Sequence, residues 1–256
     1  MLRMLILILL PVACLLPPGT GAGEIIGGHE AKPHSRPYMA YLEIKRGHAI
    51  HICGGFLVSK NFVLTAAHCN GDSITVLLGA HNINKGEQSQ ERIHVSRHIL
   101  HDQYKKETKK NDIMLLQLEK SVKLNSFVGT LTLPYANDRV KPGTMCSVAG
   151  WGKLYPNASP FPDTLQEVDV KVMPDDACPK QVYRHYNAST MMCVGEPEYL
   201  KDSAKGDSGA PLVCGGKAHG IVSWGPPKPP GVYTKVSAFI PWIKATMKNL
   251  PPGARL

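Results

Sequence analysis

Short apolar runs separated by turn residues dominate the chain after residue 24. Runs rich in Val, Ile, Leu and Thr, such as residues 75–78 and 166–172, are punctuated by Gly, Pro and Asn. This pattern is typical of antiparallel β-structure, in which short strands alternate with tight turns. Only residues 236–247 carry a clear helical stripe, with apolar side chains three and four positions apart. The pattern therefore predicts an all-β protein with one helix near the C-terminus.

The first 22 residues follow a different pattern. Arg3 precedes an apolar stretch over residues 4–10, and a second apolar stretch gives way to small residues ending at Ala22. This arrangement is typical of a secretory signal peptide, and it is too short and too interrupted by Pro for a transmembrane span. No later segment is apolar enough to cross a bilayer. We therefore expect a secreted product with one large β-domain or two fused subdomains.

Three short runs, far apart in the chain, carry the candidate chemistry. They are residues 65–69, 111–116 and 206–209, which contain His68, Asp112 and Ser208 respectively. A serine hydroxyl becomes a nucleophile when an imidazole accepts its proton, and a buried carboxylate fixes the tautomer of that imidazole. The order His, Asp, Ser is that of chymotrypsin-type serine proteases. The three runs therefore predict a catalytic acyl-transfer site.

The sequence offers an alternative interpretation at two of these three runs. Asp102 competes for the carboxylate role, but it is flanked by polar residues and lysines, whereas Asp112 precedes an apolar run. The Gly-Asp-Ser-Gly run alone could be an ordinary turn. As part of a site, its small residues would let the main-chain N–H groups of Gly206 and Ser208 form an oxyanion hole. No spacing typical of a metal site occurs, and no cofactor is expected.

From Ile25 to about Met247, the chain resembles the granule serine proteases of cytotoxic lymphocytes, neutrophils and mast cells. These are the granzymes, cathepsin G and the chymases. The resemblance lies in the motifs at residues 25–28, 33–40, 53–57 and 148–152. It implies two six-stranded antiparallel β-barrels of the chymotrypsin type, with the site in the cleft between them and a C-terminal helix. It also implies a secreted serine endopeptidase of cytolytic or mast cell granules, acting on protein and peptide substrates and controlled by serine protease inhibitors.

The cysteines agree with an oxidising compartment. Of seven cysteines, Cys14 lies in the signal peptide, and the others allow several connectivities. The resemblance implies these three pairs: Cys53 with Cys69, Cys146 with Cys214, and Cys178 with Cys193.

The resemblance also implies how the enzyme is activated. A cut before Ile25 would free an amino group that pairs with the carboxylate of Asp207, next to the nucleophile. Each charge is costly to bury alone, so the pair would form the oxyanion hole only after cleavage. Residues 23–24, Gly and Glu, resemble the dipeptide that a granule dipeptidyl peptidase removes from granzymes. We therefore expect a signal peptide over residues 1–22, an activation dipeptide over 23–24 and a serine protease domain over 25–256.

Asp202 lies six residues before Ser208, at the position that forms the base of the primary pocket in the family. Asp202 is followed by Ser203, as in trypsin-like enzymes. A carboxylate at the closed end of a narrow pocket favours a cationic side chain, so cleavage after Arg or Lys is expected. Residues Ser223, Trp224 and Gly225 resemble the family strand that pairs with the substrate backbone. Gly231 resembles a residue of the far pocket wall, so contacts with substrate are expected at all four positions.

Three departures from the trypsin pattern keep alternatives open. Ala204 stands where trypsins have a cysteine that bridges the pocket walls, and residues 226–230 form a short Pro-rich segment. Chymase-like or Asp-directed specificity is therefore the alternative for the same enzyme. Ala210 replaces a family glycine after Gly209; a positive φ there would cost about 1 kcal/mol or more, whereas a negative φ would make Ala harmless. A catalytically weak basic antimicrobial or glycan-binding protein is the alternative that this substitution favours.

The chain is basic, with a formal net charge of +9. Lysines gather at Lys105, Lys106, Lys109 and Lys110, and Lys45 and Arg46 form a second basic spot. Such a surface favours polyanions, here sulfated proteoglycan rather than nucleic acid, unless it is merely a solvated basic face. Asn157 and Asn187 begin glycosylation sequons.

Overall fold

The computed structural model describes residues 28–152, 161–179, 181–196, 206–226 and 229–250. Several predictions fall outside these residues: the signal peptide, the activation dipeptide, Ile25, Asn157, Asp202, Ser203 and Ala204. Within the described ranges, no helix is long and apolar enough to span a membrane.

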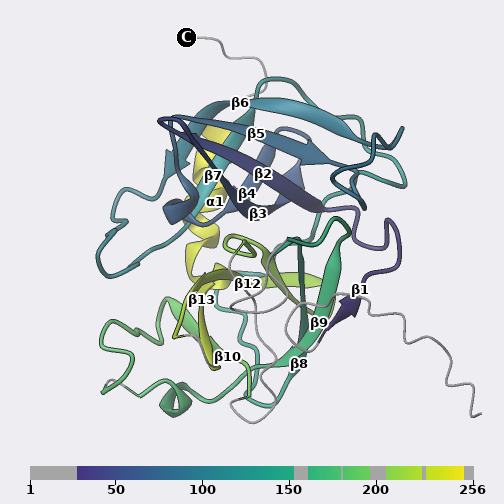
Figure 1. The fold of residues 1–256 in the computed structure, drawn as a ribbon. Helices are drawn as coiled ribbons and strands as arrows, with labels where there is room; N and C mark the ends of the chain where they lie inside the picture. Colours follow the sequence, from purple (N-terminus) through teal and green to yellow (C-terminus); the bar gives the residue numbers. More distant parts are fainter. Residues whose placement is uncertain (1–27, 153–160, 180, 197–205, 227–228, 251–256) are drawn as a thin grey trace, which may run out of the picture.

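The first half of the chain forms a closed antiparallel barrel of six strands in the order β2-β3-β4-β7-β6-β5 (Figure 1). These strands are β2 (Met39–Arg46), β3 (Ala49–Ser59), β4 (Phe62–Thr65), β5 (Ser73–Leu78), β6 (Glu91–Leu100) and β7 (Met114–Leu118). Burial alternates along β2, where Ala40, Leu42 and Ile44 are fully buried in the first core cluster while the residues between them are not. The predicted strand over 75–78 lies within β5.

The second half forms a seven-stranded sheet in the order β1-β9-β8-β11-β12-β13-β10. Its strands are β1 (His29–Glu30), β8 (Met145–Gly150), β9 (Gln166–Lys171), β10 (Met191–Val194), β11 (Pro211–Cys214), β12 (Lys217–Trp224) and β13 (Gly231–Lys235). A bridge between Val172 and Val194 links the end of β9 to β10. The N–H of Gly195 also donates to the carbonyl of Lys171 at 2.8 Å. Six of these strands thus curve round into the expected second barrel, and the short β1 is an addition at the edge of β9.

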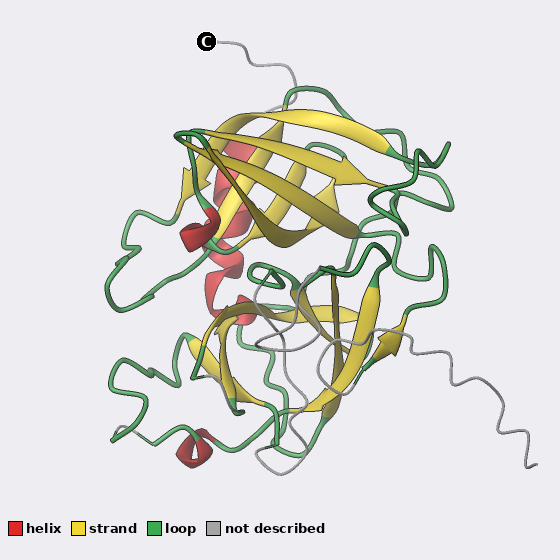
Figure 2. Cartoon of the chain, in the orientation of Figure 1, coloured by secondary structure: helices red, strands yellow, loops and turns green. Residues whose placement is uncertain are grey.

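The two sheets lie one above the other, and the C-terminal helix returns to the first barrel (Figure 2). The predicted helix over 236–247 is a 3₁₀ turn, η3 (Val236–Phe239), followed by α1 (Ile240–Asn249). Pro241 fits the first turn of α1, where its missing N–H would have no helical partner. Ile240 and Ile243 are buried in the same apolar cluster as the residues of β7, which explains why β7 is buried along its whole length.

Three disulfides are formed, and they are the three pairs that the resemblance implied. They join Cys53 to Cys69, Cys146 to Cys214, and Cys178 to Cys193. The first one ties β3 to η1 (Ala67–Cys69), the 3₁₀ turn that carries His68, and all three cross-links connect segments brought together by the barrels.

Candidate active site

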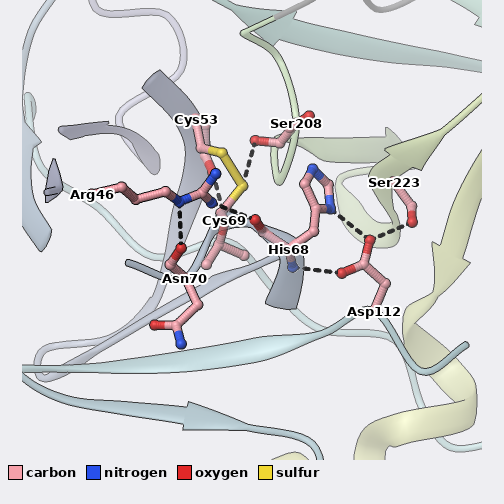
Figure 3. The surroundings of a disulfide bond; sticks show 10 residues. Arg46, Cys53, His68, Cys69, Asn70, Asp112, Ser208 and Ser223 are labelled. Atoms are coloured by element: carbon pink, nitrogen blue, oxygen red, sulfur yellow. Dashed lines mark hydrogen bonds and ion pairs between the residues drawn. A yellow bond between two sulfur atoms is a disulfide. The ribbon is translucent and has the colours of Figure 1, made fainter. Parts of the chain in front are cut away.

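His68 and Asp112 are joined by two hydrogen bonds (Figure 3). The imidazole Nδ1 of His68 lies 2.7 Å from Oδ2 of Asp112, and the main-chain N–H of His68 donates to Oδ1 at 2.8 Å. The local sequence makes this possible, because Asn111 takes a φ of 54°, a conformation that Asn tolerates, and so turns Asp112 inward before β7. Asp112 is fully buried, whereas Asp102 is exposed, so the structure brings Asp112 and not Asp102 to the imidazole.

The second sheet also holds Asp112. The Ser223 hydroxyl, at the end of β12, donates to Oδ2 at 2.5 Å, and the Thr234 hydroxyl of β13 donates to the Asp112 carbonyl at 2.8 Å. A buried carboxylate is costly unless donors surround it, and here both oxygens accept hydrogen bonds. Sequence reasoning assigned Ser223 to substrate and missed Thr234, whose buried hydroxyl follows no motif.

Ser208 lies in a turn that is held by its main chain. Its carbonyl accepts a hydrogen bond from the Gly54 N–H at 2.8 Å, and the Gly209 N–H donates to Val222 at 2.9 Å. Gly206 and Gly209 have φ values of 108° and 85°, and a Cβ on Gly209 would overlap the Thr65 hydroxyl. Both positions therefore require glycine.

The imidazole edge that faces away from Asp112 points toward the turn of Ser208 (Figure 3). Within the described residues, the Ser208 hydroxyl makes no hydrogen bond to this ring. Such contacts are often long in unliganded enzymes and tighten in the substrate complex. Such an arrangement can place a nucleophile, a base and an orienting carboxylate close together.

The disulfide between Cys53 and Cys69 packs directly against the turn of Ser208. Sγ of Cys69 lies 3.6 Å from the Ser208 carbonyl, which is a packing contact because a disulfide sulfur carries no proton. Cys53, Cys69 and His68 are also the one close group of potential metal ligands in the described part of the chain. Since both sulfurs are in the disulfide, neither can act as a thiolate ligand.

Asp207 lies in a cradle made by two glycines. It is fully buried, and its Oδ1 accepts a hydrogen bond from the Gly152 N–H at 2.8 Å. A Cβ on Gly150 or on Gly152 would overlap this carboxylate. The run at residues 148–152, which the sequence analysis used only as a family motif, therefore has a physical reason: it makes room for a buried anion.

Ala210 is accommodated without backbone strain. It is not among the described residues with positive φ, and its side chain is completely buried in the core of the second sheet. Its Cβ faces Gly54, where a further Cβ would lie only 2.9 Å away. The condition under which Ala is harmless is thus met, and Ala210 gives no support to a catalytically weak protein.

The walls of the expected pocket come close together at two glycines. A Cβ on Gly225 would lie 3.1 Å from the Cα of Gly231. The buried Tyr183 supports this wall, since its hydroxyl donates to the Pro230 carbonyl at 2.7 Å and its ring lies 5.9 Å from that of Trp224. Sequence reasoning missed Tyr183, and no motif surrounds it.

The predicted basic regions differ in how they are held. In the first, an isolated bridge pairs Lys105 with Lys110, so both exposed lysines lie at the neck of a loop just before Asp112. In the second, the guanidinium of Arg46 donates to the carbonyls of His68 and Asn70. Asn187 is exposed, and its side-chain oxygen accepts a hydrogen bond from the Ser189 N–H at 3.0 Å.

Comparisons with known proteins agree with this geometry. The family described as Trypsin matches residues 25–243. Human granzyme B is 54% identical over 244 residues, covering 94% of this chain and 98% of that protein, and human cathepsin G is 50% identical over 244 residues, with 94% of each covered. Mast cell protease 3 of sheep is 52% identical over 247 residues, covering 96% of this chain and 97% of that protein.

A solved structure described as "Structure of GrC" superposes with a TM-score of 0.84 at 50% identity, covering 88% of this chain and 100% of the other. This likeness confirms the chymotrypsin-type fold. The relatives are similar to this chain over nearly its whole length, and the family match spans both barrels. The chain therefore belongs to the trypsin family, as a serine endopeptidase of the chymotrypsin-type granule protease group.

Proposed function

We propose that this serine endopeptidase hydrolyses peptide bonds after Arg or Lys, with Ser208 as nucleophile, His68 as general base and Asp112 as the orienting carboxylate. The observation that carries the catalytic assignment is the doubly hydrogen-bonded pair of His68 and buried Asp112. This pair fixes Nδ1 as the protonated nitrogen, which leaves Nε2 free to accept a proton.

The reaction follows from this arrangement. Oγ of Ser208 attacks the scissile carbonyl carbon while its proton passes to Nε2 of His68. The carbonyl oxygen becomes an oxyanion, for which the N–H groups of Gly206 and Ser208 are the proposed donors. The imidazolium then protonates the leaving amine, and the C–N bond breaks to give the acyl-enzyme. Water then attacks the acyl carbon while His68 takes its proton, and this proton passes to Oγ of Ser208 as the ester bond breaks, which releases the acid and free Ser208.

The preference for Arg or Lys rests on Asp202 and Ser203 in the sequence, together with glycines in both pocket walls. Gly225 and Gly231 place no side chain in the proposed pocket, although their main chains approach closely, since a Cβ on Gly225 would lie 3.1 Å from the Cα of Gly231. A carboxylate at the end of this pocket would form a charge-assisted hydrogen bond with a cationic substrate. Ser223, Trp224 and Gly225 would contact the substrate backbone.

Activation is proposed to depend on the amino group of Ile25 and the carboxylate of Asp207. The support is the glycine cradle, which buries Asp207 completely beside the nucleophile. A buried carboxylate favours a cationic partner, and the amino terminus released by removal of residues 23–24 has the right charge. The proposed enzyme is thus made as a secreted precursor and stored in granules in active form. We also propose a glycan on Asn187, with a second sequon at Asn157.

The test of this proposal is a cleavage profile of the mature enzyme on a peptide library, run beside the Ser208→Ala variant. We expect cleavage after Arg and Lys by the wild type and none by the variant. Dominant cleavage after Phe, Tyr, Leu or Asp would replace the specificity proposal by its chymase-like or Asp-directed alternative. Equal cleavage by both proteins would contradict the catalytic assignment itself.

A further inference from the structure

Arg46 is a basic residue whose guanidinium is directed at the active-site turn. Its Nη2 donates to the His68 carbonyl at 2.6 Å, and its Nε donates to the Asn70 carbonyl at 2.8 Å (Figure 3). Both are charge-assisted hydrogen bonds, which are stronger than neutral ones, and two of them from one planar group fix an orientation.

The N–H groups of η1 do not donate to the carbonyls of His68 and Asn70. Within and just after η1, the N–H groups of Cys69 and Asn70 donate to the carbonyls of Ala66 and Ala67. The next acceptors along the chain, on His68 and Asn70, receive their hydrogen bonds from Arg46. Asp112 therefore holds His68 from the core side through its N–H and its ring, while Arg46 holds the same residue through its carbonyl.

The arm that carries the guanidinium is fixed as well. Arg46 ends β2, and the segment after η1 docks against this end through a hydrogen bond from the Asp72 N–H to the Lys45 carbonyl at 2.8 Å. Gly71 allows the close approach, since a Cβ there would lie 2.6 Å from the Lys45 carbonyl. The half-buried side chain thus starts from a rigid strand end and reaches two neighbouring carbonyls.

From this geometry we infer that Arg46 is a positioning residue for the general base. It clamps the main chain on both sides of Cys69, so that the imidazole stays aligned with Ser208 during proton transfer. The inference rests on the proposed role of His68. Because the guanidinium of Arg46 is engaged with main-chain carbonyls behind the general base, its loss should lower the rate of the chemical step without weakening substrate binding.

The experiment compares Arg46→Gln and Arg46→Lys with Arg92→Gln. Arg92 is the matched control because it is an exposed arginine of the same barrel, paired only at the surface with Glu43. Steady-state kinetics on a small peptide substrate give kcat and KM separately. We expect Arg46→Gln to lower kcat about tenfold or more at nearly unchanged KM, because small misplacements of catalytic groups are costly. Arg46→Lys should keep only part of the wild-type kcat, since one ammonium group cannot span two carbonyls. Arg92→Gln should change neither kcat nor KM.

Three results would overturn the inference: unchanged kcat in Arg46→Gln, a rise in KM alone, or an equal loss in Arg92→Gln. If Arg46→Gln does not fold, Arg46→Lys decides, and wild-type kcat in that variant overturns the clamp. The wild type and Ser208→Ala are measured in the same series. An active wild type with an inactive Ser208→Ala and an unaffected Arg46→Gln would contradict only this inference, whereas an active Ser208→Ala would contradict the proposed function.

Discussion

The two barrels contribute to the active site by different physical means. The first barrel supplies His68 and Asp112, which are fixed by side-chain hydrogen bonds in a buried setting. The second supplies Ser208, whose turn is fixed by main-chain hydrogen bonds and by two glycines with positive φ. Substitutions around His68 and Asp112 should therefore remove specific contacts, while those around the turn of Ser208 should act through backbone conformation and volume.

Each barrel also makes hydrogen bonds to a proposed catalytic residue of the other. Ser223 and Thr234 of the second sheet donate to Asp112, and Gly54 of the first barrel donates to the Ser208 carbonyl. Because these contacts join the two barrels, the relative position of the barrels determines the geometry of the proposed site. Substitutions in the two barrels should therefore distinguish residues that react with substrate from residues that hold them in position.

The largest loss of activity is expected when the proposed nucleophile of one barrel or the proposed base of the other is removed. Ser208→Ala in one half and His68→Ala in the other should each lower kcat by about a million-fold, because nucleophile and base act as one unit. The double variant should be no worse than either single variant. Active-site titration with an organophosphonate, which should label only Ser208, provides the check; labelling elsewhere would contradict the assignment.

An enzyme that keeps residues 23 and 24 should be inactive because of a change in the second barrel alone. Without a free amino group on Ile25, the proposed ion pair between that group and Asp207 is not made and the oxyanion hole does not form, which should lower kcat about a thousandfold. The protein should remain folded, with His68 and Asp112 undisturbed in the first barrel. The measurement compares activity and thermal unfolding before and after removal of the dipeptide; equal activity of both forms would refute the switch.

Asp202→Ser should change specificity while leaving the chemistry intact. Cleavage after Arg should fall about a thousandfold, since a charge-assisted contact in a poorly hydrated pocket is lost. Labelling of Ser208 by a small non-basic acylating probe should continue at the wild-type rate. The ratio of kcat/KM for Arg and Phe substrates measures the effect, and an unchanged ratio would place Asp202 outside the pocket.

The sequence predicted the parts of the site whose chemistry is tied to motifs. The runs around His68, Asp112 and Ser208 contain the residues that the structure brings together. Short apolar runs between turn residues predicted the β-structure, the helical stripe predicted the single helix, and the resemblance implied the two barrels. Arg46, Thr234 and Tyr183 were missed in these roles, because each one acts on a main-chain carbonyl of a residue far away in the sequence. Such pairings depend on the closed barrels, and no local pattern encodes them.

Gly54 and Ala210 test the packing between the halves. Gly54→Ala should lower the free energy of unfolding by about 1–3 kcal/mol, because its Cβ would lie 2.9 Å from that of Ala210 in a full core. Ala210→Gly alone should be mildly destabilising, by about 1 kcal/mol, from loss of a buried methyl group. Together the two changes should cost less than their sum, as a double-mutant cycle by chemical denaturation would show. Additive effects would mean that the two side chains do not share this space.

The smallest catalytic effect is expected at the lysines of residues 105–110, which lie near the site in sequence but make none of its described hydrogen bonds. Changing Lys105, Lys106, Lys109 and Lys110 to Gln should lower the salt concentration that elutes the enzyme from heparin, because a local cluster binds a polyanion better than scattered charges. Hydrolysis of a small peptide should hardly change, since exposed charges are screened and Asp112 keeps its buried donors. The matched control changes four exposed lysines spread over the surface, Lys32, Lys85, Lys141 and Lys244, and removes the same charge. Equal elution of the two variants would mean that net charge alone governs binding, and that the lysines before Asp112 form an ordinary solvated face.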